Sequence, residues 1–136
     1  MWALNRMGAA PENLRITEIS IAASHEQQYE PNDFTVKTKQ PIEITFRNKN
    51  GHPLNVSILK PGSTDAVGEK VDAGETSSDV LFSSKVIDSG ESTKLQMIAP
   101  STPGSYPFVS TTPKDWRQFR GTLRVKAPPP PPKKEE

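Results

Sequence analysis

Short stretches in which apolar and polar residues alternate run through most of the chain. In the segment 41–48, Ile42, Ile44 and Phe46 alternate with polar residues, which places the apolar side chains on one face of a strand. The same alternation marks the segments 14–21, 33–38, 54–60, 80–87, 91–99, 106–112 and 121–126. Clusters of Pro, Gly, Asn and Asp separate these runs. Such short strands divided by turns predict an all-β sandwich or barrel.

One predicted strand is irregular. The apolar residues of the segment 14–21 change phase midway, since they are Leu14, Ile16, Ile19 and Ile21. A single step out of phase predicts a bulge or a short bend in that strand.

The segment 61–79 has no alternation and interrupts the series of strands. Its sequence is predicted to hold one short helix, with Ser63 or Thr64 as the residue that caps it. Glu69 and Lys70 are expected on the outward face of this helix.

Both ends of the chain differ from this pattern. Residues 1–13 are small and polar, with Trp2 interspersed, and are interpreted as an N-terminal arm. The segment 127–136 holds five consecutive prolines, which favour extended polyproline II at about 3 Å per residue. The sequence therefore predicts one folded domain over 14–126, followed by an extended tail.

Composition narrows the possible functions. A length of 136 residues fits one domain. The absence of cysteine excludes disulfides, thiolate metal sites and cysteine nucleophiles. Positive and negative residues nearly cancel, at 17 against 16, and no dense basic run is present. This balance disfavours a duplex nucleic-acid binder.

The sequence contains no candidate membrane span, since no apolar run approaches the ~20 residues that a bilayer requires. The start MWALNRMGAAPENL lacks an apolar core of signal-peptide length. Either a leader has been removed and the mature protein is exported, or Met1 is the native start and the protein is cytoplasmic.

Several separated motifs resemble a known family. Residues 54–63 read LNVSILKPGS, and the later stretch 106–121 reads YPFVSTTPKDWRQFRG, followed by the strand TLRV. Over roughly residues 30–126 the chain resembles the cupredoxins, the blue-copper fold of azurin, auracyanin and plastocyanin. It is most similar to cupredoxin modules attached to bacterial membrane-associated dehydrogenases and haem proteins. The resemblance implies an antiparallel Greek-key β-sandwich with one short helix.

The resemblance also identifies the positions at which the family holds copper. There, one strand carries His-Asn-x-Val, and a loop carries Tyr-x-x-x-Cys-x-x-Pro-Gly-His-x-x-x-Met. In this chain the four ligand positions are occupied by Leu54, Ser110, Asp115 and Phe119. A blue-copper site needs a thiolate and two imidazoles, so we expect no metal and no cofactor. Burial of Leu54 and Phe119, worth about 1.5–3 kcal/mol each, is expected to close the former site instead.

The neighbours of these positions keep a family feature. Asn55 follows the first ligand position and Thr111 follows the cysteine position. The resemblance implies that these two residues tie the ligand loops together by hydrogen bonds. The segment before Val80 is shorter than in the family, so one edge of the former site is expected to be more open.

Two other chemistries remain as alternatives. His52, in the turn NGHP, is interpreted as a solvated histidine; the alternative is a non-standard metal or electron-transfer site that it forms with Asp115, with His25 as a further candidate. A serine hydrolase built from Ser110, His52 and Asp115 would need a serine–histidine hydrogen bond and an oxyanion hole, and no G-x-S-x-G motif is present.

Trp116 allows two interpretations. It either covers the end of the sandwich, or it forms the centre of a docking surface whose basic rim is Lys114, Arg117 and Arg120. A single-stranded nucleic acid would use similar chemistry, but one aromatic residue is a thin platform for it.

Together these observations predict a non-enzymatic, metal-free structural or docking subunit of a larger bacterial membrane-associated electron-transfer assembly. Other protein subunits are the expected partners, through the loop 112–119, the arm with Trp2 and the tail with Pro130. No nucleic acid is expected. Because the resembled family is typically exported, the periplasm is the expected compartment.

Overall fold

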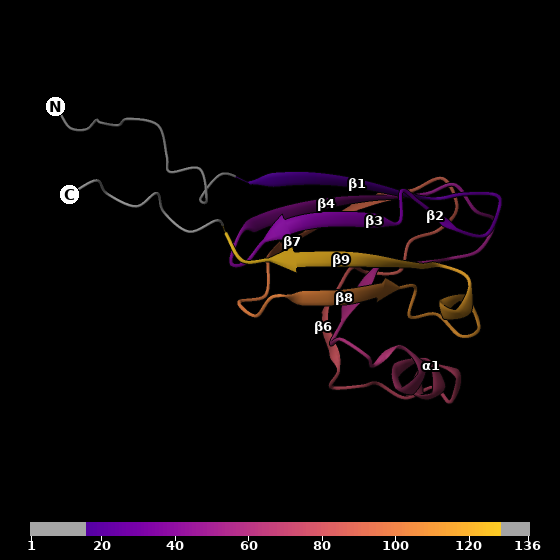
Figure 1. Cartoon of the computed structure of the whole chain (residues 1–136). Helices are drawn as coiled ribbons and strands as arrows, with labels where there is room; N and C mark the ends of the chain where they lie inside the picture. Colours follow the sequence, from indigo (N-terminus) through magenta and orange to yellow (C-terminus); the bar gives the residue numbers. More distant parts are fainter. Residues whose placement is uncertain (1–15, 129–136) are drawn as a thin grey trace, which may run out of the picture.

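The computed structural model describes residues 16–128, which form two β-sheets packed face to face, with one helix at the side (Figure 1). The first sheet has the strand order β2-β1-β4-β7, with β1 Thr17–Ala23, β2 Tyr29–Glu30, β4 Pro41–Asn48 and β7 Ser92–Ile98. The second has the order β3-β9-β8-β5-β6, with β3 Asp33–Lys37, β5 Ser57–Leu59, β6 Val80–Ser83, β8 Gly104–Val109 and β9 Arg120–Lys126. The helices are α1, Thr64–Asp72, and a short 3-10 helix, Asp115–Arg117.

The predicted sandwich is confirmed, but its sheets are not purely antiparallel. Strand β1 runs parallel to β4, and β3 runs parallel to β9; the pairs β4–β7, β8–β9, β5–β8 and β5–β6 are antiparallel. The alternation of apolar residues has the same period in both kinds of pairing, so it did not distinguish them. The Greek-key connectivity stays a prediction.

The core lies between the two sheets and follows the predicted alternation. Ile42, Ile44 and Phe46 of β4 are buried, as are Phe108 of β8 and Leu123 of β9 on the facing sheet. Gly121 lies opposite Phe108 in the β8–β9 register. A β-carbon at position 121 would stand 2.1 Å from the Phe108 ring, so this site admits glycine alone without a shift of the ring.

The predicted bulge in the first strand is absent. The register of β1 with β4 is continuous from Thr17 to Ala23, and Ile19 and Ile21 both face the core. The change of phase arises because Ile16 precedes the strand and is 60% exposed. Leu14 lies outside the described residues.

The predicted helix is confirmed as α1, with Glu69 and Lys70 exposed. Ser63 occupies the N-cap position but makes no side-chain cap; its hydroxyl donates to the Lys60 carbonyl oxygen at 2.7 Å. The predicted arm 1–13 with Trp2, and residues 129–136 of the tail with Pro130, lie outside the described residues.

Candidate functional site

The loop 110–119 lies at one end of the sandwich, opposite the end at which β1 begins and β9 finishes (Figure 1). Leu54, Ser110 and Phe119 have no exposed surface there, and Asp115 is half-buried. Leu54 forms an isolated bridge with Ile87, and the Ser110 N–H donates to the Phe119 carbonyl oxygen at 3.1 Å. The side chains of Leu54 and Phe119 contain no donor atom for a metal. Apolar packing therefore closes this end of the molecule.

Beneath these positions lies Tyr29, a residue that no sequence motif identified. Its ring lies 5.6 Å from that of Phe119 and 5.4 Å from that of Phe108, between centroids. Its hydroxyl donates to the Asn55 carbonyl oxygen at 2.5 Å. Burial raises the pKa of the Tyr29 hydroxyl well above its ordinary value; hydrogen bonding with Ser110 opposes this shift and the Asp115 charge adds to it. A lone aromatic in the polar stretch HEQQYE was the available signal.

Asn55 joins three segments of the chain. Its Oδ1 accepts from the Thr111 N–H at 2.7 Å, and its Nδ2 donates to Thr111 Oγ1 at 2.9 Å. The same Nδ2 lies 3.3 Å from Ser83 Oγ and 3.4 Å from Ser57 Oγ. Asn55 is only 3% exposed. Without these hydrogen bonds, burial of its amide would cost free energy of folding. They hold the loop after β8 against the segment that precedes β5.

Ser110 and Asp115 belong to one line of hydrogen bonds. The Thr112 hydroxyl donates to Asp115 Oδ2 at 2.8 Å and lies 2.7 Å from Ser110 Oγ. Because the Thr112 proton is directed to Asp115, Ser110 donates its own proton to Thr112. Ser110 Oγ in turn accepts from the Asn55 N–H at 3.3 Å. The line runs from the buried amide to the half-buried carboxylate and orients both loops.

The structure does not assemble the alternative sites around His52. His52 and His25 lie in exposed turns, and the partners of the Ser110 hydroxyl are Asn55 and Thr112 rather than a histidine. The serine–histidine bond that the hydrolase hypothesis requires is thus not made. Among residues 16–128, no group of three or more His, Cys, Asp or Glu side chains is placed to hold a metal ion.

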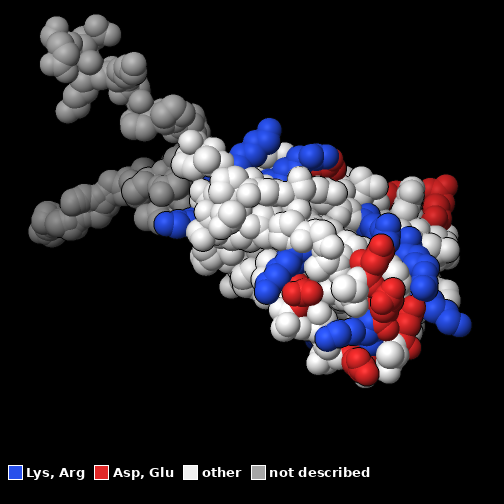
Figure 2. Space-filling view, turned by 60° about the horizontal axis from the view of Figure 1, so that its bottom comes forward, with Lys and Arg blue, Asp and Glu red and all other residues white. Residues whose placement is uncertain are grey.

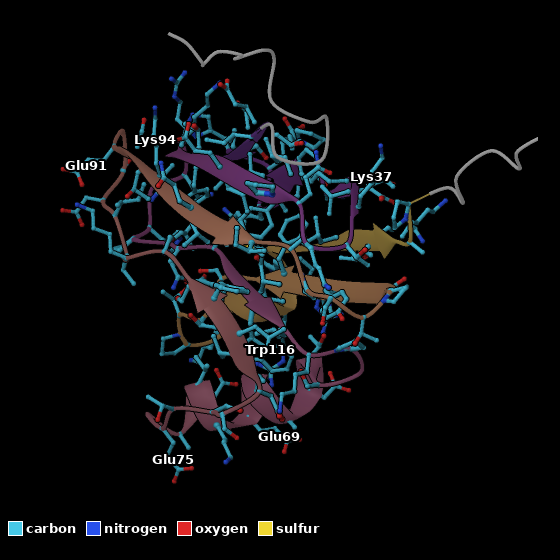
Figure 3. The ribbon with its side chains drawn as sticks, turned by 90° about the vertical axis from the view of Figure 1, so that its left-hand side faces the viewer. Lys37, Glu69, Glu75, Glu91, Lys94 and Trp116 are labelled. Atoms are coloured by element: carbon cyan, nitrogen blue, oxygen red, sulfur yellow. The ribbon has the colours of Figure 1, made fainter. Side chains whose placement is uncertain are left out.

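Trp116 is buried rather than displayed. It is 4% exposed and packs with Leu59, Val67 and Val109 in a second, smaller core. Figure 3 shows it between α1 and the strands, with Glu69 and Glu75 on the outer side. Of its two interpretations, the structure favours the one in which it covers the sandwich; its ring is not an open docking platform.

One carboxylate fastens this loop to the helix. Asp72, at the end of α1, accepts hydrogen bonds from the Lys114 N–H at 2.7 Å, the Trp116 Nε1–H at 3.1 Å and the Arg117 guanidinium at 3.0 Å. The Lys114 N–H, followed by Trp116 and Arg117, lowers the pKa of the Asp72 carboxyl. No sequence pattern predicted this role, because Asp72 resembles any other polar residue at the end of a helix.

The predicted basic rim is interleaved with acidic groups. Lys114, Arg117 and Arg120 are exposed, but Arg117 pairs with Asp72, and an Arg120 guanidinium nitrogen lies 3.6 Å from Asp65 Oδ1. Figure 2 shows positive and negative side chains mixed over the region of the molecule that carries α1. The guanidinium carbons of Arg117 and Arg120 lie 4.4 and 5.6 Å from the Trp116 ring centroid. The surface around the loop is therefore charged but not uniformly basic.

The edge expected to be open contains a hollow. Beside Thr111 the structure has a cavity of about 380 Å³. Val71, Val80 and Ser83 line it, together with the segment 75–77. It lies between the end of α1 and the hydroxyl groups around Asn55.

These features define a β-sandwich protein in which packing and hydrogen bonds occupy the end where a relative would hold copper. The family model described as a cupredoxin-like domain matches residues 1–125, and the chain belongs to this family. The resemblance inferred from the motifs is thereby confirmed, for a member with none of the four copper ligands. No curated protein matches the sequence significantly.

Solved structures of blue-copper proteins are similar to this chain. Auracyanin from Roseiflexus castenholzii is 29% identical, with a TM-score of 0.73, and the match covers 82% of this chain and 98% of that protein. Auracyanin A from Chloroflexus aurantiacus is 20% identical, with a TM-score of 0.74 and coverages of 82% and 100%. An azurin from Methylomonas sp. strain J is 16% identical, with a TM-score of 0.71 and coverages of 81% and 98%. The last two show the fold alone. In the described part of the chain, no helix has the length and apolar character of a membrane span.

Proposed function

We propose that this protein is a metal-free cupredoxin that serves as a structural or docking subunit of a larger bacterial electron-transfer assembly at the membrane, without catalytic activity. The observation that carries the proposal is the complete burial of Leu54 and Phe119 at former ligand positions. The other two positions support it, since Ser110 and Asp115 direct their polar atoms to Thr112. The chain has kept the scaffold and has filled the site with side chains.

The proposed docking surface includes the exposed residues of the loop 112–119. Asp72 and the packing of Trp116 make this loop a rigid surface, on which Lys114 and Arg117 are exposed. The arm and the tail, with Trp2 and Pro130, are the proposed contacts at the other end. Because the described chain begins and ends far from the loop (Figure 1), the proposal involves two separate contact regions. Export to the periplasm, as the family resemblance suggests, is part of it.

The experiment is co-purification from the native cell, followed by native mass spectrometry. We expect a complex that is lost on Lys114→Glu and retained on Lys94→Glu. Lys114 belongs to the loop, whereas Lys94 lies on β7, with its ammonium 3.6 Å from Glu43. Both variants replace a lysine by a glutamate, so they make the same change of charge at different places on the surface. Detection of only a free monomer under native conditions would overturn the proposal.

A copper titration separates the proposal from the alternative electron carrier. We expect neither Cu(I) nor Cu(II) to bind stoichiometrically, because Asp115 is engaged by Thr112 and imidazoles bind such ions weakly without partners. Stoichiometric binding that disappears in His52→Ala would instead establish a site at His52.

A further inference from the structure

The sandwich has an open flank between β7, an edge strand of the first sheet, and β6, an edge strand of the second. Each of these strands has a sheet neighbour on one side only. A groove of about 540 Å³ runs between them, with Pro61, Leu81, Phe82, Ile98 and Tyr106 among its lining residues. Leu81 and Phe82 are only half-buried, although they also pack against the core. Unpaired strand edges beside an apolar groove form a surface that another segment can cover.

This groove continues into a second hollow on the outer side of the first sheet. The second hollow has a volume of about 270 Å³, shares Ile98 with the groove, and is lined by Ile16, Pro41 and Met97. Three large hydrophobic side chains are exposed among residues 16–128, and two of them, Ile16 at 60% and Ile98 at 55%, lie here. Exposed apolar surface that is contiguous in this way marks a contact site.

We propose that the segment 1–15 of the same chain covers this surface. The segment is joined directly to Ile16, which itself lines the hollow. Fifteen residues reach up to about 50 Å when extended. Its sequence, MWALNRMGAAPENLR, supplies the apolar side chains of Met1, Trp2, Leu4 and Met7. A tether of this length keeps such side chains at roughly millimolar effective concentration next to the groove.

The charges of the molecule are consistent with this occupant. Figure 2 shows that charged side chains gather around α1, while the same face is largely uncharged toward the end at which β1 begins and β9 finishes. The segment 1–15 carries the charged residues Arg6, Glu12 and Arg15, and its first five residues have no charged side chain. The inference does not rest on the proposed function. In the isolated protein the segment 1–15 occupies the groove, and a partner subunit that binds this segment would uncover it.

The absence of cysteine allows a clean test with the full chain. A nitroxide attached to Asn5→Cys carries a paramagnetic probe on the segment without removing an apolar side chain. We expect the amide resonances of Leu81, Phe82 and Ile98 to lose most of their intensity. Resonances of Val86, the third exposed hydrophobic residue and not a lining residue of either hollow, should keep theirs.

Two variants and one mixing experiment make the test decisive. Ile98→Lys should abolish the broadening at Leu81 and Phe82, whereas the matched control Val86→Lys should leave it intact. Labelled protein mixed with unlabelled, isotope-enriched protein should produce no broadening in the enriched copies. The proposal is overturned if the groove resonances are unaffected by the probe. It is equally overturned if broadening passes between copies, since the occupant would then be the arm of a second molecule.

Discussion

The indole ring of Trp116 lies directly against Gly68 of α1, so closely that a β-carbon at position 68 would stand 2.2 Å from Trp116 Cε2. The helix and the loop are thus fitted to each other at one point. Asp72, one helical turn after Gly68, accepts a hydrogen bond from the Nε1–H of the same Trp116 ring. The contacts with α1 therefore fasten the 110–119 segment to the rest of the protein.

Gly68→Ala should destabilise the protein, although alanine ordinarily favours a helix by about 1 kcal/mol over glycine. The added methyl group overlaps the buried indole, and overpacking of this kind costs about 1–3 kcal/mol. Chemical denaturation of the variant and the parent protein measures the difference in the free energy of unfolding.

The double variant Gly68→Ala with Trp116→Leu is the control for that prediction. With the smaller side chain at position 116, the Gly68→Ala change should become neutral or stabilising. If the substitution destabilises the protein equally in both backgrounds, the contact with Trp116 is not its cause.

Asp72 predicts a particular dependence of stability on pH. Its pKa is lowered in the folded state, chiefly by the Lys114 N–H, so the unfolded chain binds a proton at a higher pH than the folded chain does. The stabilisation is complete above the ordinary carboxyl pKa of about 4 and is lost as pH falls below it. Melting temperatures between neutral and acid pH should therefore show a drop that is smaller in Asp72→Asn.

Two further variants locate that effect. Asp65→Asn changes another carboxylate of α1, one that is 87% exposed and lies 3.6 Å from Arg120; because it leaves the Asp72 contacts intact, it is the matched control for Asp72→Asn. Asp33, whose pKa Arg124 lowers by hydrogen bonding, should supply part of the remaining slope. An acid slope that persists unchanged in the Asp72→Asn and Asp33→Asn double variant would contradict the assignment.

The sequence predicted the strands well where burial is one-sided. The segment 41–48 coincides with β4, because Ile42, Ile44 and Phe46 alternate strictly with polar residues. It missed β2, since Tyr29 stands alone in a polar stretch and two residues carry no period. The parallel pairing of β1 with β4 could not be predicted either, because it depends on contacts between residues far apart in the sequence.

At the site, the sequence identified positions but not all contacts. The family motif placed Leu54 and Phe119 at one end of the sandwich, where the structure buries them. The sequence did not decide whether Trp116 faces solvent, because the helix that covers it, α1, comes from another part of the chain. Asp72 was invisible for the same reason, since its three donors come from residues more than forty positions later.

Asn55→Ala should destabilise the sandwich by about 1–3 kcal/mol, because it leaves the Thr111 N–H without its acceptor and removes the bonds of a buried amide. Thr111→Val is a matched comparison, since it removes one hydroxyl while it keeps the backbone bond to Asn55. Its cost should be smaller, as measured by urea denaturation of both variants. A larger loss in Thr111→Val would mean that the hydroxyl cluster, and not the amide, holds the two loops.

The end of the sandwich that holds Leu54 and Phe119 allows a test in which copper ligands are introduced. The variant with Leu54→His, Ser110→Cys, Asp115→His and Phe119→Met restores a thiolate, two imidazoles and a weak axial ligand at the family positions. Because hydrogen bonds between Asn55 and Thr111 still join the two loops, we expect this variant to bind one copper ion and to show the intense visible absorption of a copper–thiolate bond. The same variant with Ser110 retained lacks the thiolate and should remain colourless. A folded fourfold variant that binds no copper would show that the loops have moved away from the geometry of the copper-binding relatives, and that burial of Leu54 and Phe119 reshaped this end rather than merely filling it.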